Sequence, residues 1–309
     1  MNDYIRIMRL DHWVKQLFVL PGVFIAVLLT HRSLADTMLW QQLTIGLLSV
    51  SFIASANYVI NEWLDAGSDR FHPVKKYRAV VSGHVRGSVV WILWLLLTAL
   101  GMGCAWLVNK SFAACAAWLW LMGILYNVRP IRTKDIPVVD VLSESLNNAI
   151  RLFLGWFVIS PTLLPPCSIV LGYWMVGAYL MATKRFAEYR MIGNKAEAAQ
   201  YRKSFRYYNE VLLLTSAFFY ALLSVFFIGT FLVKYRTELL LFIPFLIGVY
   251  CYYLRLAFDD DSSVQKPEKL YREHRLMIYC IFLVLWFVFL LFCDIPWLRI
   301  FTNDQLIAF

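Results

Sequence analysis

The sequence predicts an all-α, polytopic membrane protein, and three observations lead to that fold class. Of its 309 residues, 61% are hydrophobic and only 16% are charged. The mean hydropathy is +0.62, well outside the usual soluble composition. Several runs between Leu17 and Phe292 reach the roughly 20 apolar residues that a helix needs to cross a bilayer. A soluble globular enzyme is therefore excluded.

Polar breaks divide the chain into a bundle of nine expected transmembrane helices, within one domain that covers residues 1–309. In chain order, the expected helices cover residues 17–30, 40–64, 88–108, 112–127, 139–160, 168–184, 211–233, 238–256 and 276–293. No small-residue cleavage site closes the first apolar run, so we expect a retained span rather than a signal peptide. Short connections at 109–111 and 160–167 predict antiparallel helix pairs.

The basic residues predict the orientation of this bundle. Of the 29 lysines and arginines, 23 fall in or at the edges of the alternate loops on the side of the N-terminus, five fall on the opposite side, and Arg151 falls well within a span. The positive-inside rule then places the N-terminus in the cytoplasm and the C-terminus outside. We expect a multi-pass protein of the inner or plasma membrane with its active site at the cytoplasmic face, where the long loops lie.

Other compositional signals add little. The net charge of +9 does not indicate nucleic-acid binding, because no basic run alternates with aromatic residues on a soluble domain. The six cysteines show no metal-ligand spacing and are interpreted as small buried hydrophobic residues. The number of chains in the assembly stays open, with a homo-oligomer as one option.

A cluster of polar residues ends the second expected helix. Asn61, Asp65 and Asp69 recur every four residues, a step that drifts by only about 40° around a helix, so their side chains share one face. Two carboxylates and an amide oxygen, completed by water and substrate phosphate, form the shell that Mg²⁺ prefers. The alternative is a solvated helix end whose acids offset nearby cations, but it does not predict the regular spacing.

The pattern N-E-x-x-D-x-x-x-D from Asn61 to Asp69 resembles the N-D-x-x-D-x-x-x-D motif of UbiA-type intramembrane prenyltransferases, with Glu62 in place of the usual aspartate. In that superfamily the motif binds Mg²⁺ and a diphosphate. The resemblance therefore implies Asn61, Asp65 and Asp69 as metal ligands, Asp65 and Asp69 as catalytic residues, and Asn61 and Glu62 as contacts to the substrate.

Two basic stretches resemble the decaprenyl-phosphate phosphoribosyltransferase subgroup of that superfamily. They are R-L-D-H-W-V-K, which ends at Lys15, and D-R-x-H-P-x-K-K-x-R from Asp69 to Arg78. The substrate-binding residues that they imply are Lys15, His72, Lys75, Lys76 and Arg78. For His72, a phosphate donor and an ordinary surface histidine are both open.

A second polar region precedes and enters the fifth expected helix. In the superfamily, Y-x-x-x-K/R leading to an aspartate after the fourth helix helps to bind phosphate, which implies Tyr126, Arg129, Lys134 and Asp140. The fifth helix continues with a polar stripe that ends at Arg151, and such a stripe must face the bundle interior rather than lipid. A substrate contact of Arg151 and a structural network with Glu144 or Asp140 are both open.

The third cytoplasmic loop is basic where aromatic prenyltransferases carry a second acidic motif. It begins with Lys184 and Arg185, which can donate charge-assisted hydrogen bonds to a phosphate that no metal neutralises. The alternative is that this loop only follows the positive-inside rule or meets anionic lipid. The last cytoplasmic loop, residues 259–275, mixes both charges and is interpreted as a lid or a solvated loop.

The resemblance implies Mg²⁺-dependent transfer of a phosphoribosyl group from 5-phosphoribosyl 1-diphosphate (PRPP) to a polyprenyl phosphate, with release of diphosphate. The product would be a lipid-linked precursor of a pentose donor, such as arabinose, for cell-wall glycans. An alternative keeps the fold but transfers an isoprenoid from its diphosphate to an aromatic acceptor. A third interpretation is a lipid or solute transporter without enzymatic activity.

Overall fold

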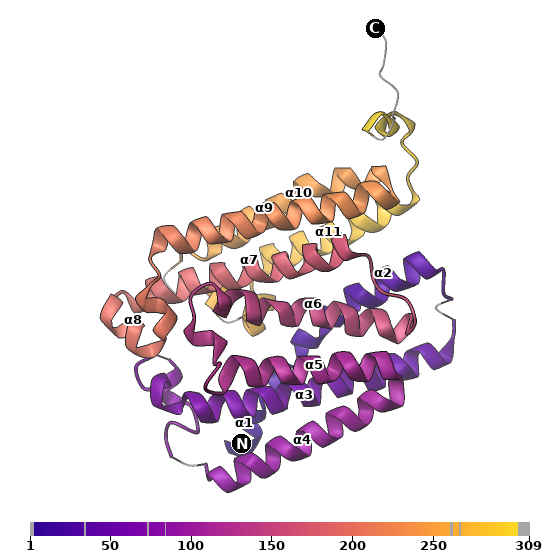
Figure 1. Cartoon of the computed structure of the whole chain (residues 1–309). Helices are drawn as coiled ribbons and strands as arrows, with labels where there is room; N and C mark the ends of the chain where they lie inside the picture. The colour runs from indigo at the N-terminus through magenta and orange to yellow at the C-terminus, as the bar shows by residue number, and fades with distance from the viewer. Residues whose placement is uncertain are drawn as a thin grey trace. The chain divides into compact units, whose positions relative to one another are not determined.

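The computed structural model describes residues 3–33, 35–72, 74–83, 85–259, 262–265 and 267–301, and within these residues every regular element is a helix (Figure 1). The longer helices are α2 (Leu20–Thr30), α3 (Thr37–Asp69), α4 (Gly87–Val108), α5 (Lys110–Asn127), α6 (Val139–Ile159), α7 (Cys167–Ile192), α9 (Glu210–Tyr235), α10 (Ile243–Leu256) and α11 (His274–Phe292). Each of the expected segments thus contains a helix. The predicted ends were wrong by five residues at Asp69 and by eight at Ile192, because polar residues continue both helices beyond their apolar parts.

Shorter elements lie between these helices. They are α1 (Asp3–Met8), α8 (Lys195–Tyr201) and the 3₁₀ helices η1 (Leu10–Val19), η2 (Lys75–Tyr77), η3 (Thr133–Asp135), η4 (Lys203–Arg206), η5 (Thr237–Phe242), η6 (Ser263–Gln265), η7 (Pro267–Arg272) and η8 (Pro296–Phe301). The last expected cytoplasmic loop contains η6 and η7, whereas its residues 260, 261 and 266 lie outside the described residues. Its role as a lid or a solvated loop stays a prediction.

Six helical stretches among the described residues are long and apolar enough to cross a membrane. They are Asp3–Thr30, Thr37–Asp69, Gly87–Val108, Glu210–Tyr235, Thr237–Leu256 and His274–Phe292. Helices α5, α6 and α7 are not among them, and α6 carries Asp140, Glu144 and Arg151. The chain is a multi-pass membrane protein, while nine crossings and a cytoplasmic N-terminus stay predictions.

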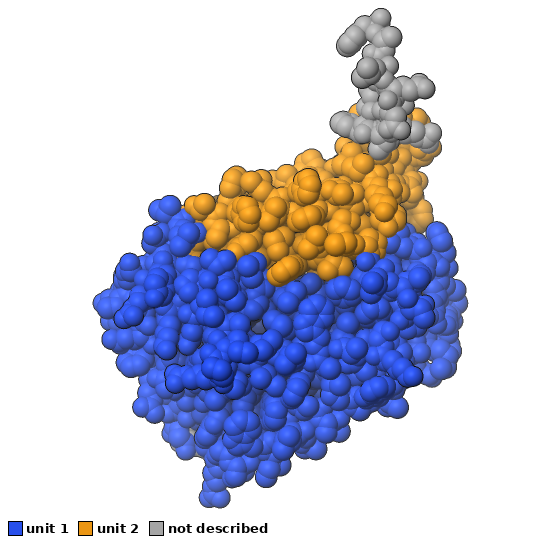
Figure 2. Space-filling model, in the orientation of Figure 1, with its two compact units in different colours: residues 1–165, 189–212 blue, residues 166–188, 213–309 orange. Residues whose placement is uncertain are grey.

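The chain divides into two compact units (Figure 2). The first unit comprises residues 1–165 and 189–212, and the second comprises residues 166–188 and 213–309. Whether both belong to one domain, as expected from the sequence, stays a prediction.

In the first unit, α3 packs against α4, α5 and α6, and small residues set the helix separations. Ser49 of α3 donates a hydrogen bond to the carbonyl of Gly101 on α4 at 2.7 Å. A Cβ at Gly155 of α6 would lie 2.0 Å from the carbonyl oxygen of Val19, so the segment that leads into α2 can approach α6 only at a glycine. This close packing fixes the lateral position of α3, whose end carries the acidic residues.

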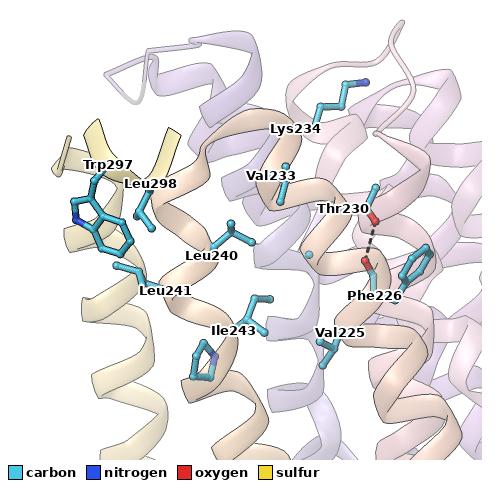
Figure 3. Close-up of a pocket in the computed structure, with 12 residues that line it drawn as sticks. Val225, Phe226, Thr230, Val233, Lys234, Leu240, Leu241, Ile243, Trp297 and Leu298 are labelled. Carbon is cyan, nitrogen blue, oxygen red and sulfur yellow. Dashed lines mark hydrogen bonds between the residues drawn. The ribbon is translucent and has the colours of Figure 1, made fainter. Parts of the chain in front are cut away.

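In the second unit, aromatic side chains join α7, α9, α10 and α11. Tyr179 donates to the carbonyl of Tyr250 at 2.5 Å, and the hydroxyl of Tyr250 accepts from Ser224 at 2.9 Å. An apolar pocket of about 900 Å³ is lined by residues of α9, η5, α10 and η8, with Lys234 and Thr230 among them (Figure 3). None of the residues predicted from the sequence to form the site lines this pocket.

Candidate active site

The predicted acidic cluster occupies the last turns of α3 in the first unit. Asp69 is 2% exposed and Glu62 is 4% exposed, while the side chain of Asp65 is 13% exposed. Burial of a carboxylate costs free energy unless a cation or hydrogen-bond donors compensate its charge. The partners of these three groups therefore define what this end of the helix can bind.

Two of the carboxylates pair with arginines from separate segments. Arg9, between α1 and η1, donates from Nη2 to Oε2 of Glu62 at 3.2 Å. Arg78, directly after η2, donates from Nη1 to Oδ2 of Asp69 at 2.5 Å. The two basic stretches that resemble the phosphoribosyltransferase subgroup thus both reach the acidic end of α3.

Asp65 has the largest set of cationic partners. It accepts hydrogen bonds from Arg132 at 2.9 Å and from Lys134. Lys134 also donates to Oδ1 of Asn127 at 2.7 Å, and the same oxygen accepts from Nδ2 of Asn61 at 2.5 Å. Burial lowers the pKa of the Lys134 ammonium to about 8, against the opposing effect of the Asp65 carboxylate. One hydrogen-bonded network therefore connects α3, the end of α5 and η3.

The segment from α8 to η4 adds another arginine to this region. Arg202 donates from Nη1 to the hydroxyl of Tyr126 at 3.1 Å, and Lys75 donates to the hydroxyl of Tyr201. The ring of His72 lies edge-on to the ring of Tyr201 at 4.6 Å. Because His72 is only 4% exposed, its interpretation as a surface histidine was wrong. The segment from α8 to η4 thus contacts Tyr126 and Lys75, which belong to two different groups of residues predicted to bind substrate.

Asp140, at the start of α6, holds the same loop in place. It is fully buried and accepts hydrogen bonds from Ser204 at 3.1 Å and from Tyr208 at 2.5 Å. Nη1 of Arg202 lies 3.7 Å from its second oxygen, and the hydroxyl of Tyr208 accepts from the backbone N–H of Val138 at 2.6 Å. These protein donors surround the carboxylate, so its geometry suits a residue that positions Arg202.

Arg151 lies deeper along the polar face of α6. Its guanidinium donates to Oε1 of Gln16 at 3.2 Å, to the carbonyl of Asn147 at 3.3 Å and to Oδ1 of Asn148 at 3.4 Å. Gln16 is 2% exposed, so this part of η1 is buried against α6. The arginine is therefore held inside the first unit, as the polar stripe predicts.

The other predicted residues of the first unit lie nearer its surface. Lys76 is exposed, with its Nζ 5.2 Å from the centre of the Tyr77 ring. Lys15 lies with its Nζ 3.0 Å from Nδ1 of His12. Arg129 is exposed and lines a pocket that is described below. Lys76 and Arg129 are therefore accessible to an anionic ligand, whereas Lys15 is half-buried.

Lys184 and Arg185 belong to the second unit. Arg185 donates to Oε2 of Glu188 at 3.1 Å, and both side chains are buried. Their predicted role in binding a lipid phosphate stays a prediction.

The donor set at the end of α3 is suited to a metal that is shared with a substrate. Among the described residues, no group of three or more histidine, cysteine, aspartate or glutamate side chains could hold a metal ion by itself. Asp65 and Asp69 lie one helical turn apart, and Asn61 lies one turn earlier on the same face. Mg²⁺ commonly binds one or two carboxylates and takes its other ligands from water and substrate phosphates, so these residues fit that ion.

The model of the UbiA prenyltransferase family matches residues 19–288. The chain belongs to the UbiA prenyltransferase family. Its fold is similar to that of a UbiA homolog from Archaeoglobus fulgidus solved with GPP and Mg²⁺, with a TM-score of 0.69 at 20% identity over 93% of this chain and 99% of that chain. The predicted family membership is thus confirmed.

Curated relatives of this UbiA family member include a decaprenyl-phosphate phosphoribosyltransferase from Corynebacterium glutamicum. It is 25% identical over 225 residues, which cover 69% of this chain and 61% of the relative. The nodulation protein NoeC from Azorhizobium caulinodans is 30% identical over 141 residues, or 45% of this chain and 43% of the relative. The chain therefore spans less than two thirds of the length of these curated relatives, and the first of them supports the resemblance to the phosphoribosyltransferase subgroup.

Proposed function

We propose that this protein transfers the phosphoribosyl group of PRPP to a polyprenyl phosphate at the cytoplasmic face of the membrane. One observation carries the proposal: the buried carboxylates at the end of α3 form ion pairs with cations from several separate segments. These cations are Arg9, Arg78, Arg132 and Lys134. Carboxylates suit a metal, while the surrounding arginines and lysine suit phosphate oxygens. A relative named decaprenyl-phosphate phosphoribosyltransferase supports the choice of substrates.

In this proposal, Asp65 and Asp69 hold Mg²⁺ with the aid of Asn61. The metal, when bound, supplies positive charge to the leaving diphosphate. Arg132 and Lys134 form ion pairs with Asp65, and Arg78 forms one with Asp69. With Mg²⁺ held by these carboxylates, the same cations would donate to phosphate oxygens.

The basic residues around α3 then bind and orient the donor. Oxygens of the diphosphate are bound by Lys75, Lys76 and Arg78. A hydrogen bond to Asn127 directs Lys134 toward the same region. The bond between ribose C1 and the diphosphate oxygen breaks, and the diphosphate leaves with the electron pair. A phosphate oxygen of the lipid attacks C1, which has oxocarbenium character, so that no protein nucleophile is needed.

Arg151 is proposed to attract the acceptor phosphate, since its hydrogen bonds with Gln16 and Asn148 fix a cation inside the first unit. Lys184 and Arg185 keep the same predicted role within the second unit. In the proposed membrane topology, nine helices cross and the N-terminus is cytoplasmic, which puts the end of α3 on the cytoplasmic side.

The test incubates purified protein with Mg²⁺, labelled PRPP and a panel of polyprenyl phosphates, and measures label in the organic phase. We expect a lipid product that forms only with the metal and is accompanied by diphosphate release. Transfer of a prenyl group from its diphosphate to an aromatic acceptor, without use of PRPP, would replace this function with the alternative. Solute flux in proteoliposomes without either product would favour a transporter.

A further inference from the structure

A second pocket lies next to the acidic cluster, and Arg129 is the one residue of its lining that the sequence analysis predicted to bind substrate. It has a volume of about 720 Å³ and belongs entirely to the first unit. Its lining consists of Arg129, Pro130, Ile131, Arg132, Asp135, Ile136 and Lys203. Three of these side chains are cationic and one is anionic, so the pocket has the charge of an anion-binding site.

Arg132 connects this pocket to the end of α3. Its Nη2 donates to Asp65 at 2.9 Å, and its Nε lies 3.3 Å from Oδ2 of Asp135. That Nε is buried, and it donates no hydrogen bond to any residue that the structure describes. Buried N–H groups rarely lack an acceptor in native proteins, so this donor is suited to an oxygen atom of a bound ligand.

The backbone at Arg132 is also unusual. Its φ is 34° and its ψ is 63°, which is the left-handed region that side chains other than glycine rarely adopt. Such strain persists where the surrounding structure enforces it, and it is concentrated at binding sites. From this backbone position, one guanidinium contacts Asp65 and lines the pocket.

The two remaining cations are available to a ligand. Arg129 is exposed and forms no ion pair among the described residues, and Lys203 is 69% exposed and lies 3.9 Å from Asp135. Arginine and lysine on a pocket wall donate charge-assisted hydrogen bonds to phosphate oxygens. A bound phosphate would therefore compete with Asp135 for these cations.

We propose that the pocket of Arg129, Arg132 and Lys203 is a phosphomonoester subsite that binds the 5-phosphate of the donor. The proposal rests on the proposed function, because PRPP carries anionic groups at both ends of one ribose. Its diphosphate lies at the metal-binding carboxylates, and its monoester lies in the adjacent pocket, with Arg132 between them. A prenyl diphosphate has one anionic end only and leaves this pocket unused, so the subsite selects the donor.

The test compares the wild type with the double variant Arg129→Gln/Lys203→Gln. A matched control, Lys195→Gln/Arg206→Gln, removes two exposed cations from the neighbouring loop. Three probes are used with Mg²⁺: PRPP, ribose 5-phosphate and inorganic diphosphate. We expect the double variant to raise the KM for PRPP and the Kd for ribose 5-phosphate by about tenfold or more, and the Ki of inorganic diphosphate by less than about twofold.

The control variant should match the wild type for all three probes, and equal thermal unfolding would show that both variants are folded. Equal binding of ribose 5-phosphate by the wild type and the double variant would overturn the subsite. Equal weakening of all three probes would also overturn it, because it would indicate a general effect of charge. Failure of the wild type to use PRPP would instead overturn the proposed function, while a selective loss of ribose 5-phosphate binding would still support the pocket as a phosphomonoester site.

Discussion

The charged ends of α3 and α7 show two ways to bury ionic groups. At the end of α3, Glu62, Asp65 and Asp69 pair with cations that lie between 9 and 69 positions away in the sequence. At the end of α7, Arg185 pairs with Glu188 of its own helix, three positions away. Both sets are largely buried.

The two sets differ in how far apart along the sequence their paired charges lie. The α7 pair joins two residues one helical turn apart, so this hydrogen bond can form within a single helix. The α3 carboxylates need three other segments to fold against them, which brings several cations and carboxylates together at one place. We infer that convergence from distant segments, rather than burial of charge, identifies the site.

The strongest test of this comparison is Asp65→Ala, which removes a proposed metal ligand. We expect turnover to fall by about 1,000-fold or more, equivalent to about 4 kcal/mol of lost transition-state stabilisation. The assay is metal-dependent transfer of label from PRPP to lipid. The control is Glu210→Ala, which removes a carboxylate of the same unit. The side chain of Glu210 is 49% exposed, and its loss should leave turnover unchanged. Activity of Asp65→Ala within a few-fold of wild type would refute the metal assignment.

Glu188→Ala tests the structural side of the comparison. It leaves the guanidinium of Arg185 buried without this carboxylate, so the free energy of unfolding should fall by about 3 kcal/mol. Thermal unfolding in detergent measures the change. The double variant Arg185→Met/Glu188→Leu should recover most of the lost free energy of unfolding. If Glu188→Ala unfolds at the same temperature as the wild type, the pair contributes little to stability.

Asp140→Ala should affect the site through Arg202. The variant loses the carboxylate that accepts hydrogen bonds from Ser204 and Tyr208, so the segment around η4 no longer holds Arg202 in place. We expect kcat/KM to fall by about 30-fold, equivalent to about 2 kcal/mol. Asp140→Asn keeps one acceptor oxygen and should restore most of the activity. If alanine and asparagine reduce activity equally, the carboxylate contacts substrate instead of positioning the loop.

The smallest effect is expected for Tyr208→Phe. This change removes one hydrogen bond to Asp140 and one from the N–H of Val138, while Ser204 still donates to the carboxylate. We expect kcat/KM to fall by about fivefold, near 1 kcal/mol. The exposed Tyr207→Phe is the matched control. A loss as large as that of Asp140→Ala would mean that Tyr208 alone fixes the loop.

Several parts of the fold could be predicted because their causes are local. The apolar runs locate the longer helices, and Asn109 caps α5 by accepting from the N–H of Phe112 at 2.8 Å. The four-residue spacing of Asn61, Asp65 and Asp69 placed them on one helical face for the same reason. The predicted ends of α3 and α7 were too early, since polar residues continue both helices beyond their hydrophobic parts.

Other site residues could not be singled out from the sequence. Asn127 sits at the end of an apolar helix, and only its bonds with Asn61 and Lys134 show that it joins α3 to η3. Arg132 and Arg202 looked like ordinary members of basic loops. The signal that could have drawn attention to Arg132 was its place within the stretch from Tyr126 to Asp140.

By itself, the sequence determined the helical membrane class, the longer helices and the acidic face of α3, because hydrophobicity and helical periodicity act over neighbouring residues. Only the tertiary structure decided which cations meet Asp65, that Asp140 holds the loop of Arg202, and that Arg132 borders a second pocket. Those contacts join residues 64 to 69 positions apart, and their geometry arises only when the helices pack and fix the intervening loops.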